Sequence, residues 1–104
     1  MAKEISDAEF SKEVEQNQGV VFVDFWASWC GPCRMMAPVF DKMSQKYPAI
    51  KFCKVNTEEH MAKAGQLGVS GIPCIIIFKN GQEVNRLVGF QPEPVFEGIV
   101  KQYL

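Results

Sequence analysis

The sequence predicts an α/β fold in which helices cover both faces of a sheet. Residues 20–25 and 74–78 are nearly unbroken runs of apolar, mostly β-branched residues, typical of strands buried on both faces. Segments with apolar residues at helical spacing alternate with these runs. The 104 residues, 47% of them hydrophobic, suffice for one compact domain and are too few for two. We therefore expect a single domain over residues 1–104.

The N-terminal part of the chain predicts a weak strand over residues 2–5 and a helix over about 7–17. Ser6 and Glu9 have the spacing of a capping box, in which the serine hydroxyl bonds the Glu9 amide and the glutamate returns to the Ser6 amide. The helix is expected to end before Gly19, and the first buried strand follows.

A long amphipathic helix is expected after that strand. Its apolar residues recur at helical spacing at Met36, Val39, Phe40, Met43 and Tyr47. Pro38 lies within this segment, where it removes a hydrogen bond to the carbonyl of Arg34 and collides with it. We expect the proline to interrupt the helix and to kink its first turn away from the rest.

One more strand and two more helices are predicted downstream. The strand lies near residues 50–56, and Thr57 then starts a short helix that ends around Gly65. The last helix opens near Pro92 and carries apolar residues at helical spacing as far as Tyr103.

The dipeptide Asn80-Gly81 is typical of a tight β-hairpin. It connects the buried run at 74–78 to a strand over about 83–88, so these two strands are antiparallel. The predicted order of elements is βαβαβαββα.

Composition and charge exclude several classes of function. The 11 basic and 12 acidic residues nearly balance, and no run of Lys or Arg is present, so nucleic acid is not an expected partner. Acidic residues throughout the N-terminal part exclude a secretory signal as written, and no apolar run approaches the ~20 residues of a membrane span. We expect a soluble, monomeric, cytoplasmic protein with no membrane partner.

A Cys-x-x-Cys motif formed by Cys30 and Cys33 is the strongest functional signal in the chain. It follows Trp29 and stands where the first buried strand gives way to the long helix. Positions three apart lie on one side of a helix, so the two sulfurs are within bonding reach with little backbone movement. This spacing predicts redox chemistry.

Two other interpretations of the motif are a structural disulfide and half of a zinc site. Zinc normally takes four ligands, usually in two spaced pairs, but Cys53 and Cys74 form no second pair and His60 has no partner. We therefore expect no metal. The chain also carries no flavin or nicotinamide fingerprint, so no bound cofactor is expected and electrons must come from another protein.

The positions of the two cysteines relative to the start of the helix predict different roles for their thiols. Unpaired amides and the positive end of the helix dipole stabilise a thiolate at Cys30, which we expect to be the attacking sulfur. Cys33, one turn further in, is shielded and should resolve the mixed disulfide. Gly31 and Pro32 offer no charge or side-chain donor, which favours reduction over oxidation, and we include both in the surface that meets the substrate.

Asp24 is the one charged residue in the first buried strand, and it is either buried or turned to solvent at an edge. The apolar surroundings favour burial, which raises the pKa of a carboxyl. Near Cys33, such a group would accept the proton of that thiol during resolution. Lys54 would lie beside Asp24 and limit the rise. The alternative is a surface lysine and a purely structural aspartate.

The segment from Trp26 to Cys33, Trp-Ala-Ser-Trp-Cys-Gly-Pro-Cys, closely resembles the active-site segment of the thioredoxin family. The chain also has that family's length and element order. The resemblance implies a thioredoxin fold, with a central mixed five-stranded sheet flanked by four helices. It implies a thiol-disulfide oxidoreductase that reduces protein disulfides and acts as a redox electron carrier. Its partners would be a separate thioredoxin reductase, which recharges it, and disulfide-containing target proteins.

Other positions also match the family. Asp24 and Lys54 stand where it has a buried carboxylate and a partly buried lysine. Residues 70–73, Ser-Gly-Ile-Pro, resemble its cis-proline loop, and Gly89 stands at its glycine beside the site.

The resemblance implies a cis bond before Pro73 and backbone pairing of Gly71 and Ile72 with an extended substrate segment. Gly89 and the amphipathic Trp29 would complete the surface that binds the substrate.

The chain departs from the family at Cys74, where the family usually has threonine. This residue follows the loop proline, so the resemblance places a third thiol near the active pair. One interpretation is a small buried hydrophobic residue, which free cysteine often is. The other is a thiol that traps Cys30 or helps to hold a metal. Cys53, within a predicted strand, is expected to belong to the core.

Overall fold

A mixed five-stranded sheet with strand order β1-β3-β2-β4-β5 forms the centre of the computed structural model, which describes residues 2–104. The strands are β1 (Lys3–Glu4), β2 (Val20–Trp26), β3 (Lys51–Asn56), β4 (Cys74–Lys79) and β5 (Gln82–Val88). The helices are α1 (Asp7–Phe10), which continues into the π-helical turn η1 (Ser11–Glu15), α2 (Gly31–Lys46), α3 (Ala62–Gln66) and α4 (Glu93–Lys101). β1, β3 and β2 are parallel, and β4 and β5 are antiparallel to their neighbours. The predicted fold class and element order are confirmed.

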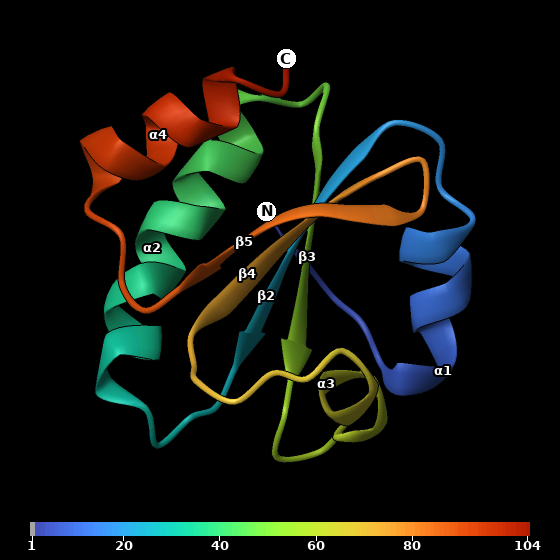
Figure 1. Cartoon of the computed structure of the whole chain (residues 1–104). Coiled ribbons are helices and arrows are strands. Elements are labelled where there is room, and N and C mark those ends of the chain that lie inside the picture. The colour runs from blue at the N-terminus through green and yellow to red at the C-terminus, as the bar shows by residue number, and fades with distance from the viewer. Residues whose placement is uncertain (1) are drawn as a thin grey trace.

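Helices cover both faces of the sheet: α2 and α4 lie on one side and α1 and α3 on the other (Figure 1). Successive residues of a strand point to opposite faces. Phe22 of β2 therefore packs in the cluster beneath α2 and α4, while Val23 packs in the cluster beneath α1. Because both faces are buried, the strand needs an unbroken apolar run, as its sequence has.

The capping box at the start of α1 is present. The Ser6 hydroxyl accepts a hydrogen bond from the Glu9 amide at 3.2 Å, and the Ser6 amide donates to the Glu9 carboxylate at 2.9 Å. The helix widens into the π-helical turn η1, closed by a bond from the Gln16 amide to the Ser11 carbonyl at 2.8 Å. The helical segment ends at Glu15, two positions before the predicted end.

α2 is one helix from Gly31 to Lys46 and continues across Pro38. The predicted interruption therefore does not divide the element. The side chains of Met36, Phe40 and Met43 are fully buried against the sheet, and this packing holds the turns on either side of the proline together. In the described part of the chain, no helix is long and apolar enough to cross a membrane.

The predicted start of α3 at Thr57 is wrong, because the helix begins at Ala62. The amide and hydroxyl of Thr57 both donate to the carbonyl of Trp26, at 2.8 and 3.1 Å, which ties this residue to the end of β2. The cap of α3 comes from Asp7 instead. Its carboxylate accepts hydrogen bonds from the amides of Ala62 and Lys63, both at 3.0 Å.

The predicted hairpin joins β4 to β5. Asn80 and Gly81 both have positive φ, 51° and 82°, as a tight turn between twisted strands requires. A side chain at Gly81 would also collide with the carbonyl of Glu15, so glycine is needed there for space as well as for conformation.

Candidate active site

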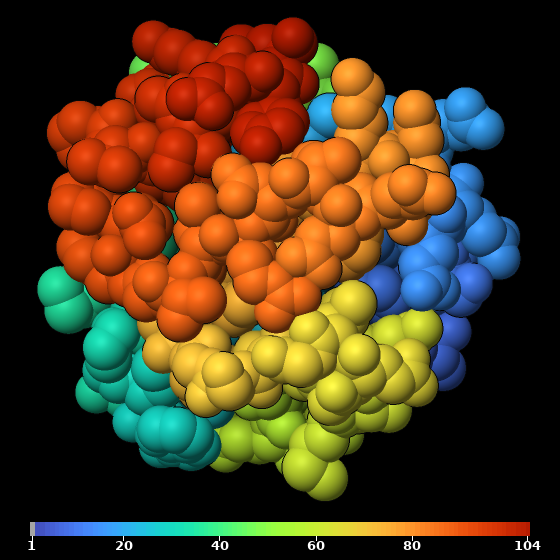
Figure 2. Space-filling model, viewed as in Figure 1, coloured from blue at the N-terminus to red at the C-terminus, as the bar shows by residue number. Residues whose placement is uncertain are grey.

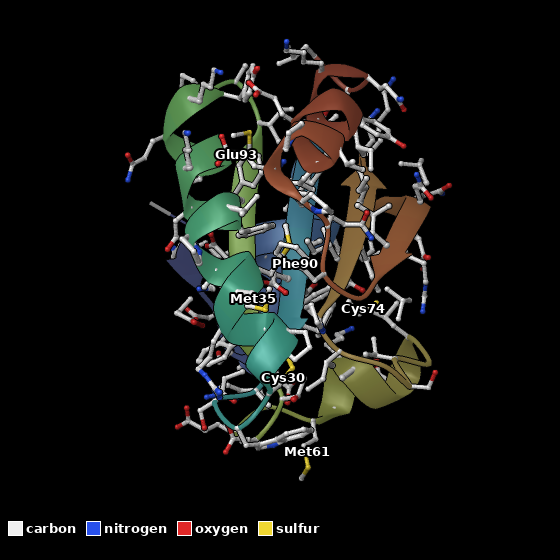
Figure 3. All side chains as sticks on the ribbon, turned by 90° about the vertical axis from the view of Figure 1, so that its left-hand side faces the viewer. Cys30, Met35, Met61, Cys74, Phe90 and Glu93 are labelled. Carbon is white, nitrogen blue, oxygen red and sulfur yellow. A yellow bond between two sulfur atoms is a disulfide. The ribbon has the colours of Figure 1, made fainter. Side chains whose placement is uncertain are left out.

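Cys30 and Cys33 form a disulfide at the N-terminal end of α2, with their Cα atoms 5.2 Å apart (Figure 3). Cys30 is the N-cap residue, and its Sγ accepts a hydrogen bond from the backbone amide of Cys33 at 3.2 Å. Both cysteines are almost fully covered, with 4% and 2% of their surface exposed, so exposure does not distinguish them. The helix terminus distinguishes them, because the Cys33 amide in its first turn points at the sulfur of Cys30 and favours a thiolate there.

The segment around the cis peptide bond between Ile72 and Pro73 lies against the dithiol. The carbonyl oxygen of Ile72 is 3.7 Å from Sγ of Cys30. The amide of Gly89, a residue with φ of 91°, donates a hydrogen bond to the carbonyl of Pro73 at 2.8 Å. The fold thus brings three distant segments to one place, and Figure 2 shows the start of α2 beside the yellow and gold segment that leads into β4.

Gly71 lies on this loop beneath a side chain of β5. A Cβ atom at this position would stand 3.0 Å from Cγ1 of Val88, closer than side chains normally approach. Val88 itself is 59% exposed. Glycine therefore lets the loop pass close to β5 and leaves its backbone accessible beside the cysteines.

Several large apolar side chains near this end of the molecule are exposed. Trp29 next to the disulfide is 69% exposed, and Met35 on the second turn of α2 is 57% exposed. Met61 lies beyond the Cys30 end of α2 in Figure 3 and is 69% exposed. The sequence pointed to Trp29 but not to Met35, Met61 or Val88. Single apolar residues outside a periodic stripe carry no signal of exposure until the fold is known.

A hydrogen-bonded clamp holds the turn before Cys30. The amide and the hydroxyl of Ser28 both donate to the Glu58 carboxylate, at 2.6 and 2.7 Å. Arg34 donates from Nη1 to the Ser28 carbonyl at 3.0 Å. The two bonds from Ser28 lower the pKa of the Glu58 carboxyl. Sequence reasoning missed Glu58, because it was assigned to a helix and its partner lies 30 positions away.

Asp24 is buried, with 1% of its surface exposed, as the apolar run predicts. It occupies the same face of β2 as Phe22, the face that α2 covers. Neither of its carboxylate oxygens has a hydrogen-bond partner among residues 2–104. Burial raises the pKa of Asp24 to about 7, against the lowering effect of Lys54. A group with this pKa exchanges protons near neutral pH.

Lys54 lies on β3 directly beside Asp24 in the strand register. Its side chain is partly buried, and Nζ lies 5.3 Å from the centroid of the Trp26 ring. The positive charge is therefore held close to the sheet, where it partly offsets the burial of the Asp24 carboxylate.

The two remaining cysteines belong to the core on the opposite face of the sheet. Cys74 packs with Phe25 and Ile76, and Cys53 lies in the same cluster. Burial raises the pKa of the Cys74 thiol, and it raises that of Cys53 to about 11. Within the described residues, no group of three or more His, Cys, Asp or Glu side chains is placed to hold a metal. This packing supports the interpretation of Cys74 as a small buried hydrophobic residue.

The fold and the site together define the class of protein. A disulfide between two cysteines three residues apart at a helix N-terminus, with a loop backbone against it on a mixed α/β sheet, is the arrangement of a thiol-disulfide oxidoreductase.

Comparison with known proteins identifies the family. The sequence model of the thioredoxin family matches residues 1–102. A thioredoxin of Synechocystis sp. is 45% identical over 102 residues, which cover 97% of this chain and 95% of that protein. Thioredoxin 1 of Synechococcus elongatus is 44% identical, and the match covers 100% of this chain and 98% of the relative. A thioredoxin of Listeria monocytogenes is 39% identical over the full length of both chains.

The chain belongs to the thioredoxin family. It is a dithiol/disulfide oxidoreductase with a Cys-x-x-Cys active site and protein-disulfide reductase activity. Membership implies, in general terms, a reductase and target proteins as partners.

Proposed function

We propose that this chain reduces target disulfides by two successive exchanges in which Cys30 attacks and Cys33 resolves. In the first, the Cys30 thiolate attacks one sulfur of the target disulfide, expels the other as a thiolate and forms a mixed disulfide. In the second, the Cys33 thiolate attacks Cys30, closes the Cys30–Cys33 bond and releases the second target thiol. Two electrons pass from the dithiol to the target, and two protons end on its thiols.

The hydrogen bond from the Cys33 amide to the Cys30 sulfur carries this assignment. A neutral thiol is a poor acceptor, whereas a thiolate gains from an amide and from the positive end of α2. Among residues 2–104, no such bond reaches the Cys33 sulfur, which lies one turn inside the helix. Attack from outside therefore falls to Cys30.

Asp24 is the proposed proton acceptor for Cys33, and Lys54 adjusts its affinity for the proton. The support is that Asp24 is buried beneath α2, that its oxygens have no hydrogen-bond partner within residues 2–104 and that its pKa is about 7. With this pKa the carboxylate is partly ionised at neutral pH, so it can accept a proton from a thiol and later release it to solvent. Lys54 keeps part of the Asp24 population ionised at neutral pH.

The proposed substrate surface surrounds the dithiol. An extended target segment would pair with the backbone of Gly71 and Ile72, as a strand is added to a sheet edge. Pro73 and Gly89 hold that loop in place through their hydrogen bond. The exposed ring of Trp29 would cover the target beside the sulfurs. Gly31 and Pro32, at the first turn of α2, add no charge or side-chain hydrogen-bond donor of their own beside Cys30.

We further propose a separate thioredoxin reductase as the electron source, with residues 1–104 acting as one domain. Each turnover leaves the Cys30–Cys33 disulfide, so a second protein must return two electrons. A dithiol poised to reduce works where thiols are kept reduced, and the cytoplasm is the proposed location.

Single serine variants of the two cysteines test the order of attack. We expect Cys30→Ser to abolish reduction of a disulfide substrate. Cys33→Ser should still attack and should accumulate a covalent adduct between Cys30 and the target, detectable by intact mass and reversed by a dithiol reductant. Cys74→Thr is the matched control and should retain turnover. Adduct formation by Cys30→Ser, with none by Cys33→Ser, would reverse the assignment.

A further inference from the structure

Three charged side chains form one row across the parallel part of the sheet. Glu4 on β1 is the register partner of Lys54 on β3, and Lys54 is the register partner of Asp24 on β2. Register partners in a parallel pair point to the same face, so all three lie on the face that α2 covers. The row runs inward from the exposed Glu4, past the half-buried Lys54, to the buried Asp24.

The lysine in the middle of this row is not committed to either carboxylate. In residues 2–104, Lys54 forms no ion pair, and its ammonium group lies over the Trp26 ring. Its strand therefore lies between the strands that carry the outer and the inner carboxylate, with neighbouring strands about 4.8 Å apart. The positive charge of Lys54 therefore lowers the pKa of both the Glu4 and the Asp24 carboxyl.

A cleft of about 400 Å³ brings solvent to the outer end of the row. Its lining includes Glu4 and Trp26, together with Asn56 at the end of β3 and Glu59 in the following turn. Because Trp26 also lies against Lys54, the cleft reaches the side chains next to the lysine. Glu4 is thus the member of the row that lines the cleft.

We propose that Glu4 is a positioning residue that sets the protonation of Asp24 through Lys54. Its carboxylate competes for the lysine, and its negative charge opposes a second charge on Asp24. Within residues 2–104, Asp41 of α2 also faces both Asp24 and Glu4, and Glu59 faces Glu4. Although Glu4 as a residue is exposed, partial burial of its carboxyl raises its pKa, and the charge of Lys54 lowers it, which agrees with a lysine shared between the two carboxylates. The coupling of Glu4 to Asp24 does not depend on the proposed function; only its effect on the reaction of Cys33 rests on the proposed role of Asp24.

The direct test is the titration of Asp24 in the reduced protein, followed by the ¹³C shift of its carboxyl carbon. We expect Glu4→Gln to lower the midpoint by about 0.3 to 1 pH unit, from Coulomb's law for charges roughly two strand spacings apart. Glu59→Gln is the matched control: it removes one charge from the same cleft but lies off the row, so its midpoint should stay closer to that of the parent. An unchanged midpoint in Glu4→Gln, or an equal shift in both variants, would overturn the proposal.

A second measurement separates this inference from the proposed role of Asp24. The rate at which Cys33 releases the target from a mixed disulfide is followed against pH. If the Asp24 midpoint and the release profile both move in Glu4→Gln, the proposal is supported and extends to the reaction. If only the midpoint moves, coupling between Glu4 and Asp24 stands and the role of Asp24 in resolution fails. If Asp24→Asn slows release while Glu4→Gln leaves the midpoint unchanged, the proposed function stands and the Glu4 proposal fails.

Discussion

At the scale of single residues, Asp24 shows how a charge can be tolerated inside an apolar strand. Its oxygens lack hydrogen-bond partners within residues 2–104, so near pH 7 the fold holds it partly as the neutral acid. The sequence identified the residue and its burial, because a lone carboxylate in a run of Val and Phe has few alternatives. It did not reveal Glu4, since an exposed glutamate on a short edge strand looks like any solvated charge.

Asp24→Asn should slow release of the reduced target while leaving the first attack by Cys30 unchanged. The pKa of Asp24 is about 7, so the parent gains an ionised acceptor as the pH rises through neutrality, and the asparagine variant does not. We expect the release step to slow by about a hundredfold at pH ~8, the low end of what a positioned base supplies, and to differ little at pH ~5.5. Rapid-mixing kinetics with a disulfide substrate measure both steps. Equal release rates across this pH range would exclude Asp24 as the acceptor.

At the scale of elements, the ends of the helices depend on partners that are distant in the sequence. The entry to α2 is held by Glu58, and α3 is capped by Asp7 from the start of α1. Local patterns predicted α1, α2 and the hairpin well, because the Ser6–Glu9 capping box, the Cys30 N-cap and the Asn80-Gly81 turn are signals within the neighbouring sequence, even though Glu58 adds a distant contact to α2. They misplaced the start of α3. In the fold, the amide and hydroxyl of Thr57 donate to the carbonyl of Trp26 and are therefore not used to cap a helix, and only the folded sheet brings that carbonyl near.

Asp7→Ala should destabilise α3, because two amides at its first turn lose their acceptor. Loss of a cap of this kind costs about 1 kcal/mol. Hydrogen exchange should quicken for the amides of Ala62 and Lys63 more than for those of β2. Asp7→Asn, which keeps one acceptor oxygen, is the matched control and should show a smaller change. Exchange that quickens evenly throughout the protein would contradict a local cap.

At the scale of the whole molecule, the buried carboxylate makes stability depend on pH. The pKa of Asp24 in the folded protein is about 7, above its ordinary value of 3.8, so between these two values the unfolded chain has lost a proton that the folded protein keeps. This difference lowers the free energy of unfolding steadily from about pH 4 to about pH 7, after which the loss is constant.

Asp24→Asn should therefore be more stable than the parent at pH ~8, with the difference vanishing towards pH ~4. The gap between 3.8 and about 7 corresponds to about 4 kcal/mol of unfolding free energy, which sets the upper end of the gain. Denaturant unfolding of both proteins in the disulfide form, at several pH values, measures it. A stability difference that does not change with pH would contradict a buried, ionisable Asp24.

The sequence by itself determined the α/β class, the order of the elements, the dithiol at a helix start and the buried carboxylate. These features depend on the spacing of nearby residues and on apolar runs, which do not require knowledge of contacts between distant segments. Only the tertiary structure decided which groups meet. It placed the carbonyl of Ile72 beside Cys30, turned Cys74 to the opposite face of the sheet and aligned Glu4 with Lys54 and Asp24. Contacts of this kind depend on strand order and register, and those follow from how the whole chain buries its apolar surface.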